Sequence, residues 1–324
     1  MFYTDEQRGH PLFKKLSIGL ACNITSSEIL EIFQKYSYLI DSMYVSPPYT
    51  GMRDGELIKF TDKPFVNEAL RTNKQYPRYV EFAVSLAKKY DIKLDLVVNS
   101  SDVGKSELEL VRKIVDKYQP YEMTVMDKHL AFWLENYPDI RFVRSHNNKP
   151  LRTQHFTDLE YRGYIAAKQF MWNPQIWPNG GKQARILANN ACLFTCPGCH
   201  TRKDFEDIIG KDIKAAGALE AMVARISMLP EDMVLVAQHF PNITFKLYSR
   251  EKTDEMITLL SDCEQVRSSK EILSDRFSMV RWHFNNSVIV RMNAIGYDID
   301  KILRCKEELH EYFRSRCQEI TESR

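Results

Sequence analysis

The sequence lacks a hydrophobic run long enough to span a bilayer, and it lacks an excess of charge of either sign. Its 324 residues include 45 Lys and Arg against 43 Asp and Glu, a formal net charge of +2. This balance argues against a large phosphate-binding surface, so nucleic acid is not an expected partner. Residues Met1 to Arg8 include acids and no apolar stretch, so we expect no signal peptide, no membrane insertion and a cytoplasmic location.

Several signatures of common enzyme classes are also missing. The chain contains no P-loop, no GxGxxG fingerprint, no HExxH helix and no nucleophile elbow of the Ser-His-Asp type. These absences weigh against an assignment as a peptidase. No internal repeat, low-complexity tract or linker divides the chain, and 44% hydrophobic residues suffice for a large core.

What the sequence does contain is a concentration of thiols. Cys192, Cys196 and Cys199 lie within eight positions, with Pro197 and Gly198 forming a turn between them. Thiolates at such spacing converge on one centre, which favours an iron-sulfur cluster first and zinc second. The C-x3-C-x2-C spacing by itself also matches radical S-adenosylmethionine enzymes, although those usually place the motif after the first barrel strand. A Cys3His zinc site with His200, and three buried thiols without a metal, are the simpler alternatives.

A fourth ligand is available far away in the sequence. Cys22 follows the first predicted strand, Lys15 to Ala21, and the carboxyl ends of parallel strands converge on one face of a β/α barrel. Cys22 is therefore predicted to complete the metal site, and its alternative role is that of a small buried hydrophobe. The other thiols, Cys263, Cys305 and Cys317, lie among charged residues on predicted helices and are interpreted as incidental. Seven cysteines, an odd number, fit a reducing compartment.

Apolar strand-like runs alternate with amphipathic helices along the chain, which predicts an α/β fold with a parallel sheet. The expected architecture is a single (β/α)8 TIM-like barrel over residues 1–295, carrying the metal site, with a C-terminal helix over residues 296–324 packed on it. The predicted strands are Lys15–Ala21, Leu39–Val45, Ile92–Val98, Glu122–Met126, Ile140–Arg144, Gln169–Trp172, Arg185–Asn190 and Ile243–Tyr248. The sixth, Gln169–Trp172, has the weakest pattern.

The last predicted strand contributes candidate catalytic residues. Because side chains alternate along a strand, Lys246, Tyr248 and Arg250 share one side, which in a barrel can face the interior. A Lys and an Arg near a metal would bind the carboxylate or phosphate of an anionic small molecule. The alternative for Arg250 is a salt bridge at the rim. His239, before this strand, is a candidate for proton transfer at the rim, although a lone histidine is more often structural.

The segment Arg185–Cys192, leading into Cys196-Pro197, and the later Phe245–Arg250 resemble the peptidase U32 family, whose members show Asn-x-x-Cys, Cys-Pro and Phe-Lys-Ile-x-Gly-Arg motifs. Ser249 stands where that family commonly has Gly. The resemblance implies a barrel whose mouth holds a four-cysteine [4Fe-4S] cluster, in proteins that hydroxylate ubiquinone precursors or RNA bases without oxygen. It also implies, as alternatives, a non-catalytic partner of a second iron-sulfur subunit or electron donor, and a U32-type peptidase.

Overall fold

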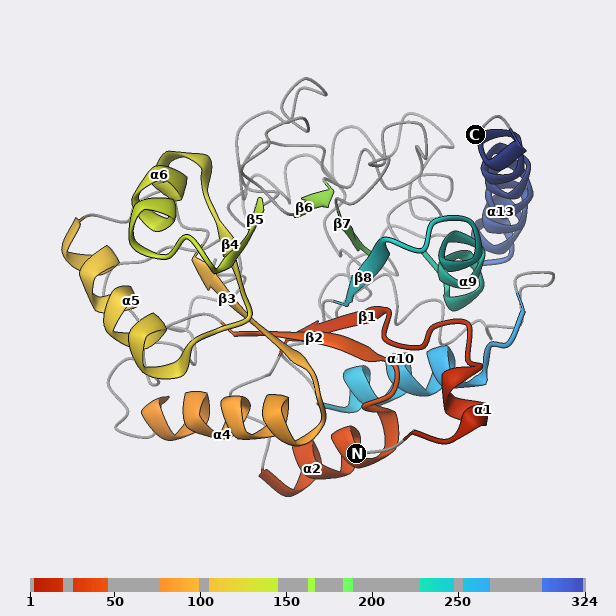
Figure 1. Ribbon diagram of the computed structural model, residues 1–324. Coiled ribbons are helices and arrows are strands. Elements are labelled where there is room, and N and C mark those ends of the chain that lie inside the picture. The colour runs from red at the N-terminus through yellow and green to blue at the C-terminus, as the bar shows by residue number, and fades with distance from the viewer. Residues whose placement is uncertain are drawn as a thin grey trace.

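In the computed structural model, the described residues are 3–19, 26–45, 76–98, 105–144, 163–166, 183–188, 228–247, 253–268 and 299–322. Their eight strands are all parallel, and each pairs with the next in sequence order until the last pairs with the first, which closes a barrel (Figure 1). The strands are β1 (Leu16–Gly19), β2 (Ile40–Val45), β3 (Lys93–Val98), β4 (Glu122–Val125), β5 (Arg141–Arg144), β6 (Gly163–Ala166), β7 (Gln183–Leu187) and β8 (Ile243–Leu247).

Helices follow most of these strands and lie outside them (Figure 1). The helices are α1 (Asp5–Arg8), α2 (Ser26–Tyr36), α4 (Tyr76–Lys89), α5 (Lys105–Tyr118), α6 (Asp127–Asn136), α9 (Pro230–His239), α10 (Thr253–Gln265) and α13 (Ile299–Glu322). The predicted α/β class and parallel sheet are thus confirmed. Residues 145–162 and 167–182, which connect β5 through β7, lie outside the described residues, so the full set of eight β/α units stays a prediction.

The outer face of the sheet is apolar because hydrophobic residues occupy alternate strand positions. Leu94 and Leu96 on β3, and Phe245 on β8, belong to one contiguous core that also includes buried residues of the surrounding helices. Burying an aliphatic side chain of this size contributes about 1.5–3 kcal/mol. The helices are therefore held to the barrel mainly by these apolar contacts with the outer face of the sheet.

The prediction for the sixth strand was wrong in position. The observed β6 spans Gly163–Ala166 and pairs with β5 on one side and β7 on the other. The predicted segment Gln169–Trp172 lies outside the described residues. Aromatic residues favoured that later segment, whereas the strand itself is a run of only four residues that local pattern scarcely distinguishes from a loop.

The predicted C-terminal helix is present as α13, which packs against α9 (Figure 1). A buried cluster of polar groups lies between the two helices: Asp232 accepts from Lys306 Nζ at 3.0 Å and contacts His310 Nδ1 at 2.6 Å. Burial opposes ionisation of Asp232, but Lys306 and His310 outweigh it and hold the pKa of that carboxyl below its usual value. Burial lowers the pKa of Lys306.

The cysteines of the described helices are free thiols. Cys263 on α10 and Cys317 on α13 are buried, whereas Cys305 on α13 is partly exposed. Burial raises the pKa of Cys263 well above its ordinary value and that of Cys317 to about 12, which keeps both thiols protonated and unreactive. Among the helices described, none is long and apolar enough to cross a membrane.

Candidate functional site

The inner face of the barrel is unusually polar. Side chains alternate along each strand, so the positions between the apolar outer residues point inward. The polar residues at these inward positions are Ser17, Ser42, Tyr44, Lys93, Asp95, Glu122, Thr124, Arg141, Arg185, Thr244 and Lys246, and the same face also carries Val97, Val143 and Leu187. Barrels of this kind are commonly filled by bulky branched aliphatic residues. Burying charged groups costs desolvation free energy, so their presence in the interior needs a reason. We therefore take the interior of the barrel as the candidate site.

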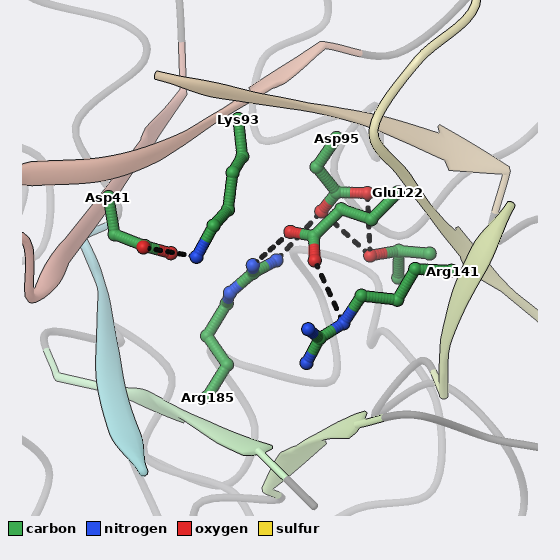
Figure 2. Close-up of polar contacts among 7 residues, drawn as sticks. Asp41, Lys93, Asp95, Glu122, Arg141 and Arg185 are labelled. Atoms are coloured by element: carbon green, nitrogen blue, oxygen red, sulfur yellow. Dashed lines mark hydrogen bonds and ion pairs between the residues drawn. The ribbon is translucent and has the colours of Figure 1, made fainter. Parts of the chain in front are cut away.

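Arg185 lies at the centre of these charges (Figure 2). Its Nη1 donates to Asp95 Oδ2 at 2.8 Å, and its Nη2 donates to Glu122 Oε1. All three side chains are at most 6% exposed. Glu122 also faces Arg141, whose Nε lies 3.7 Å from Oε2. One guanidinium therefore bridges two carboxylates that are direct partners across β3 and β4.

The two carboxylates compete for this one guanidinium, with consequences for protonation. Burial raises the pKa of Asp95 to about 6, and the neighbouring Glu122 carboxylate adds to the rise against the opposing effects of Arg185 and Lys246. Thr124 Oγ1 also lies 2.8 Å from Asp95 Oδ2 and 3.0 Å from Oδ1. Burial would lower the pKa of Arg185, but Glu122 and Asp95 outweigh it and raise that pKa, so its charge is permanent. Burial and the neighbouring carboxylate thus favour protonation of Asp95 in the folded state relative to a free aspartate.

A second ion pair lies beside the first (Figure 2). Lys93 Nζ donates to Asp41 Oδ1 at 2.6 Å. The β1–β2 register slips at this point, with Leu16 opposite Ile40 but Ser17 opposite Ser42. Asp41 is the residue that the slip skips, and such irregularities re-aim side chains. This explains how Asp41, next to an inward Ser42, reaches Lys93.

The charges are distributed unevenly along the barrel axis. Lys93, Glu122 and Arg141 are the first residues of their strands, whereas Tyr44 and Lys246 are the next-to-last residues of theirs. In β/α barrels, groups at the amino ends of the strands serve stability and those at the carboxyl ends serve chemistry. The Arg185 cluster therefore extends from the amino ends of the strands to their middle, and Lys246 lies nearer the carboxyl end.

Lys246 lies against an aromatic ring. Its Nζ is 3.9 Å from the centroid of Tyr44, and the residue is 1% exposed. Tyr44 Oη donates to Leu247 O at 2.8 Å, which fixes the ring beneath the ammonium group. A desolvated cation–π contact of this kind is worth about 2 kcal/mol. Lys246 is therefore held in place inside the barrel.

Two of the predicted site residues, Lys246 and His239, lie within the described residues. The structure places Lys246 inside the barrel, on the side that strand alternation predicted, and its catalytic role stays a prediction. His239 is the last residue of α9, where its Nδ1 lies 3.0 Å from Thr321 Oγ1 of α13. It precedes β8 and so lies at the end where the strands begin, away from the mouth. Cys22, Cys192, Cys196, Cys199, Tyr248 and Arg250 lie outside the described residues.

Sequence reasoning missed the Arg185 cluster. The available signal was a charged residue at an inward position of an otherwise apolar strand, as with Lys93 and Asp95 in the run Ile-Lys-Leu-Asp-Leu. Such alternation normally indicates a sheet with one face in water, and only closure of the barrel makes that face interior. No local pattern shows that Arg185 meets Asp95, because the two residues are 90 positions apart.

Within the described ranges, no group of three or more His, Cys, Asp and Glu side chains is placed to hold a metal ion. No protein-family model and no curated protein matches the chain. The chain is similar to a solved structure described as that of a U32 peptidase, with 13% sequence identity and a TM-score of 0.42. That similarity covers 72% of this chain and 92% of the other.

Proposed function

We propose that this chain is an iron-sulfur redox enzyme of the U32-like type, which modifies a small anionic molecule at the carboxyl mouth of its barrel. The observation that carries the proposal is the position of Lys246. It is a buried cation near the mouth end of β8, and β8 lies between β7 and β1.

The strand order supports a common site for this cation and the cysteines. Gly19 ends β1 and Leu187 ends β7, so Cys22 follows its strand by three positions and Cys192 follows its strand by five. Both strands hydrogen-bond to β8. The two segments that carry the cysteines therefore follow the two strands that neighbour β8. Connections of three and five residues would be short enough to hold both cysteines near one mouth.

The donor set fits the proposed cofactor. Four cysteines, Cys22, Cys192, Cys196 and Cys199, would hold a [4Fe-4S] cluster, which supplies one-electron transfer when bound. Zinc is the competing metal for the same thiolates. The contribution of the chain's own residues is to bind and orient the substrate. Lys246 would hold its anionic group, while the low-dielectric interior strengthens that contact.

Anaerobic purification followed by iron and sulfide analysis tests the cofactor. We expect a coloured protein that holds about four irons, and we expect Cys22→Ser and Cys192→Ser to lower the iron content. Cys305→Ser, at a partly exposed position on α13, is the matched control and should leave the iron unchanged. A colourless protein with stoichiometric zinc would overturn the redox proposal.

The catalytic part of the proposal needs a separate test. The reconstituted protein is reduced with dithionite and incubated with candidate carboxylate substrates, alone and after addition of a cell extract that supplies a partner subunit. Turnover by the isolated chain, lost in Lys246→Met, is the expected result. Turnover only with the added extract, unaffected by Lys246→Met, would instead identify a non-catalytic partner subunit.

A further inference from the structure

A buried histidine joins the N-terminal segment, residues 3–13, to the carboxyl end of α10. The backbone N–H of Leu12 donates to His10 Nδ1 at 3.0 Å, and His10 Nε2 lies 3.1 Å from Glu264 O. The histidine is 4% exposed and Leu12 is 0% exposed. Each ring nitrogen therefore contacts a backbone group, one within the N-terminal segment and one on α10.

These two partners fix the protonation state of the ring. A backbone N–H can only donate, so His10 Nδ1 accepts from Leu12 and carries no proton. A carbonyl oxygen can only accept, so Nε2 carries the proton and donates it to Glu264 O. The imidazole is neutral in this geometry, and a second proton could bind only at Nδ1. That proton would point at the N–H of Leu12, break the hydrogen bond and leave a buried donor without its acceptor.

The titratable and charged groups described around His10 belong to two neighbouring parts of the chain. Arg267, just after α10, donates from Nη1 to the same Glu264 O, and its permanent charge opposes a second cation there. The Glu264 carboxylate favours such a cation, but it already contacts Lys35 Nζ at 3.2 Å and Tyr38 Oη at 3.4 Å. The Tyr38 ring packs edge-on against the imidazole, and burial raises the pKa of its hydroxyl to about 12, which keeps it neutral. Burial of the histidine has the largest effect, and it lowers the pKa of His10.

We propose that His10 is a pH-sensitive latch for the N-terminal segment. The neutral imidazole holds residues 3–13 against the carboxyl end of α10, and binding of a solvent proton at Nδ1 releases them. Loss of that proton at higher pH restores both hydrogen bonds, so the latch is reversible. The pairing of β1 with β2 and β8 does not involve the ring, and we expect the barrel to stay closed. The latch does not depend on the proposed function.

The neutral ring sets the sign of the pH dependence. The pKa of His10 is lowered in the folded state from 6.5, so below pH 6.5 the unfolded chain binds more protons than the folded protein. The contribution of the latch is fully present above pH 6.5 and is lost as pH falls through the lower folded value. Burial raises the pKa of Asp95 instead, so the stability of the whole protein combines two opposite effects. A local measurement is needed to isolate the latch.

Hydrogen exchange of the wild-type protein from pH 5 to 8, corrected for the intrinsic rate, provides this measurement. We expect exchange in residues 8–13 to become about tenfold faster or more as pH falls below 6.5, while β3 keeps its protection. NMR of the histidine side chains tests the ring directly and needs no variant. We expect a proton on Nε2 at pH 8 and a titration of His10 below 6.5. A proton on Nδ1 at pH 8, or a pKa of 6.5 or above, would overturn the latch.

A non-titrating variant provides the second test. In His10→Asn the side-chain oxygen can accept from the N–H two residues on, as Nδ1 does, but it binds no proton in this range. Exchange in residues 8–13 should then no longer vary with pH. Thr4→Ala is the matched control, because it removes the hydroxyl that accepts from the N–H of Gln7 at 3.2 Å and caps α1. It should speed exchange in the segment at every pH and leave the pH dependence in place. A pH dependence that persists in His10→Asn would belong to another group and contradict the latch.

Discussion

The guanidinium of Arg185 on β7 lies 2.8 Å from the carboxylate of Asp95 on β3, on the opposite wall of the barrel. In a ring of eight strands, β3 and β7 are four strands apart in either direction. The contact therefore crosses the full width of the interior. It connects the two halves of the barrel where an aliphatic core would otherwise do so.

Replacing Arg185 with Met should strongly destabilise the protein. The substitution leaves Asp95 and Glu122 buried side by side without the cation between them, and loss of one partner from a buried ion pair costs about 3–5 kcal/mol. Urea denaturation of the variant measures this loss. Arg112→Met is the control, because Arg112 pairs with Glu109 on the exposed surface of α5, where such pairs contribute less than about 1 kcal/mol.

A triple variant separates the charge effect from the loss of packing. Arg185→Met combined with Asp95→Asn and Glu122→Gln removes the unpaired charges and should recover much of the lost stability. If the triple variant is no more stable than Arg185→Met, the cluster stabilises through shape alone, and the electrostatic account of the interior is wrong.

The protonation of Asp95 should appear in the pH dependence of stability. Its pKa is raised in the folded state to about 6 from an ordinary value of 3.8, so between these values the folded protein holds a proton that the unfolded chain releases. This group's contribution to the free energy of unfolding is thus fully present below pH 3.8 and is lost as pH rises through 6. Asp95→Asn should flatten that part of the profile, measured by urea denaturation from pH 4 to 7. A slope that persists unchanged in the variant would assign the titration to another group.

How much of the fold and the site the sequence predicts depends on how far apart along the chain the residues lie that form each feature. Alternation along a strand is local, so seven of the strands and the inward orientation of Lys246 were predictable. The short β6 was misplaced because a run of four residues carries little pattern. The burial of the Ser17 and Ser42 hydroxyls could not be predicted, since it is a property of the closed barrel. Partners as distant in sequence as Arg185 and Asp95 were equally unpredictable.

The attachment of α13 to α9 should depend on Asp232. Asp232→Ala removes the buried carboxylate that Lys306 contacts at 3.0 Å, and with it the acceptor for His310 and for the backbone N–H of Leu229. The expected loss is about 3–5 kcal/mol, with faster hydrogen exchange concentrated in α13 and α9. Arg316→Ala, in an exposed pair with Glu319 on α13, should change stability by less than about 1 kcal/mol. Exchange that accelerates uniformly over the barrel would contradict a local attachment.

The same carboxylate predicts an acid limit for this attachment. The pKa of Asp232 is lowered in the folded state, so its contribution is present above the unfolded value of 3.8 and is lost as pH falls through the lower folded value. This pH dependence is opposite in sign to that of Asp95, whose contribution is lost as pH rises. Relative to its intrinsic rate, hydrogen exchange in α13 should therefore stay slow down to about pH 4 and become faster only below that pH.

The final prediction concerns S-adenosylmethionine. Radical enzymes that use this cofactor hold their cluster with three cysteines and leave one iron open, which the spacing of Cys192, Cys196 and Cys199 alone would allow. Under the proposed function Cys22, three positions beyond β1, would supply a fourth thiolate, because β1 is separated from β7 only by β8. A fully ligated cluster should neither change its spectrum on addition of S-adenosylmethionine nor cleave it after reduction. Chromatographic detection of 5′-deoxyadenosine from the wild-type protein would show that Cys22 is not a ligand and would move the chain to the radical class.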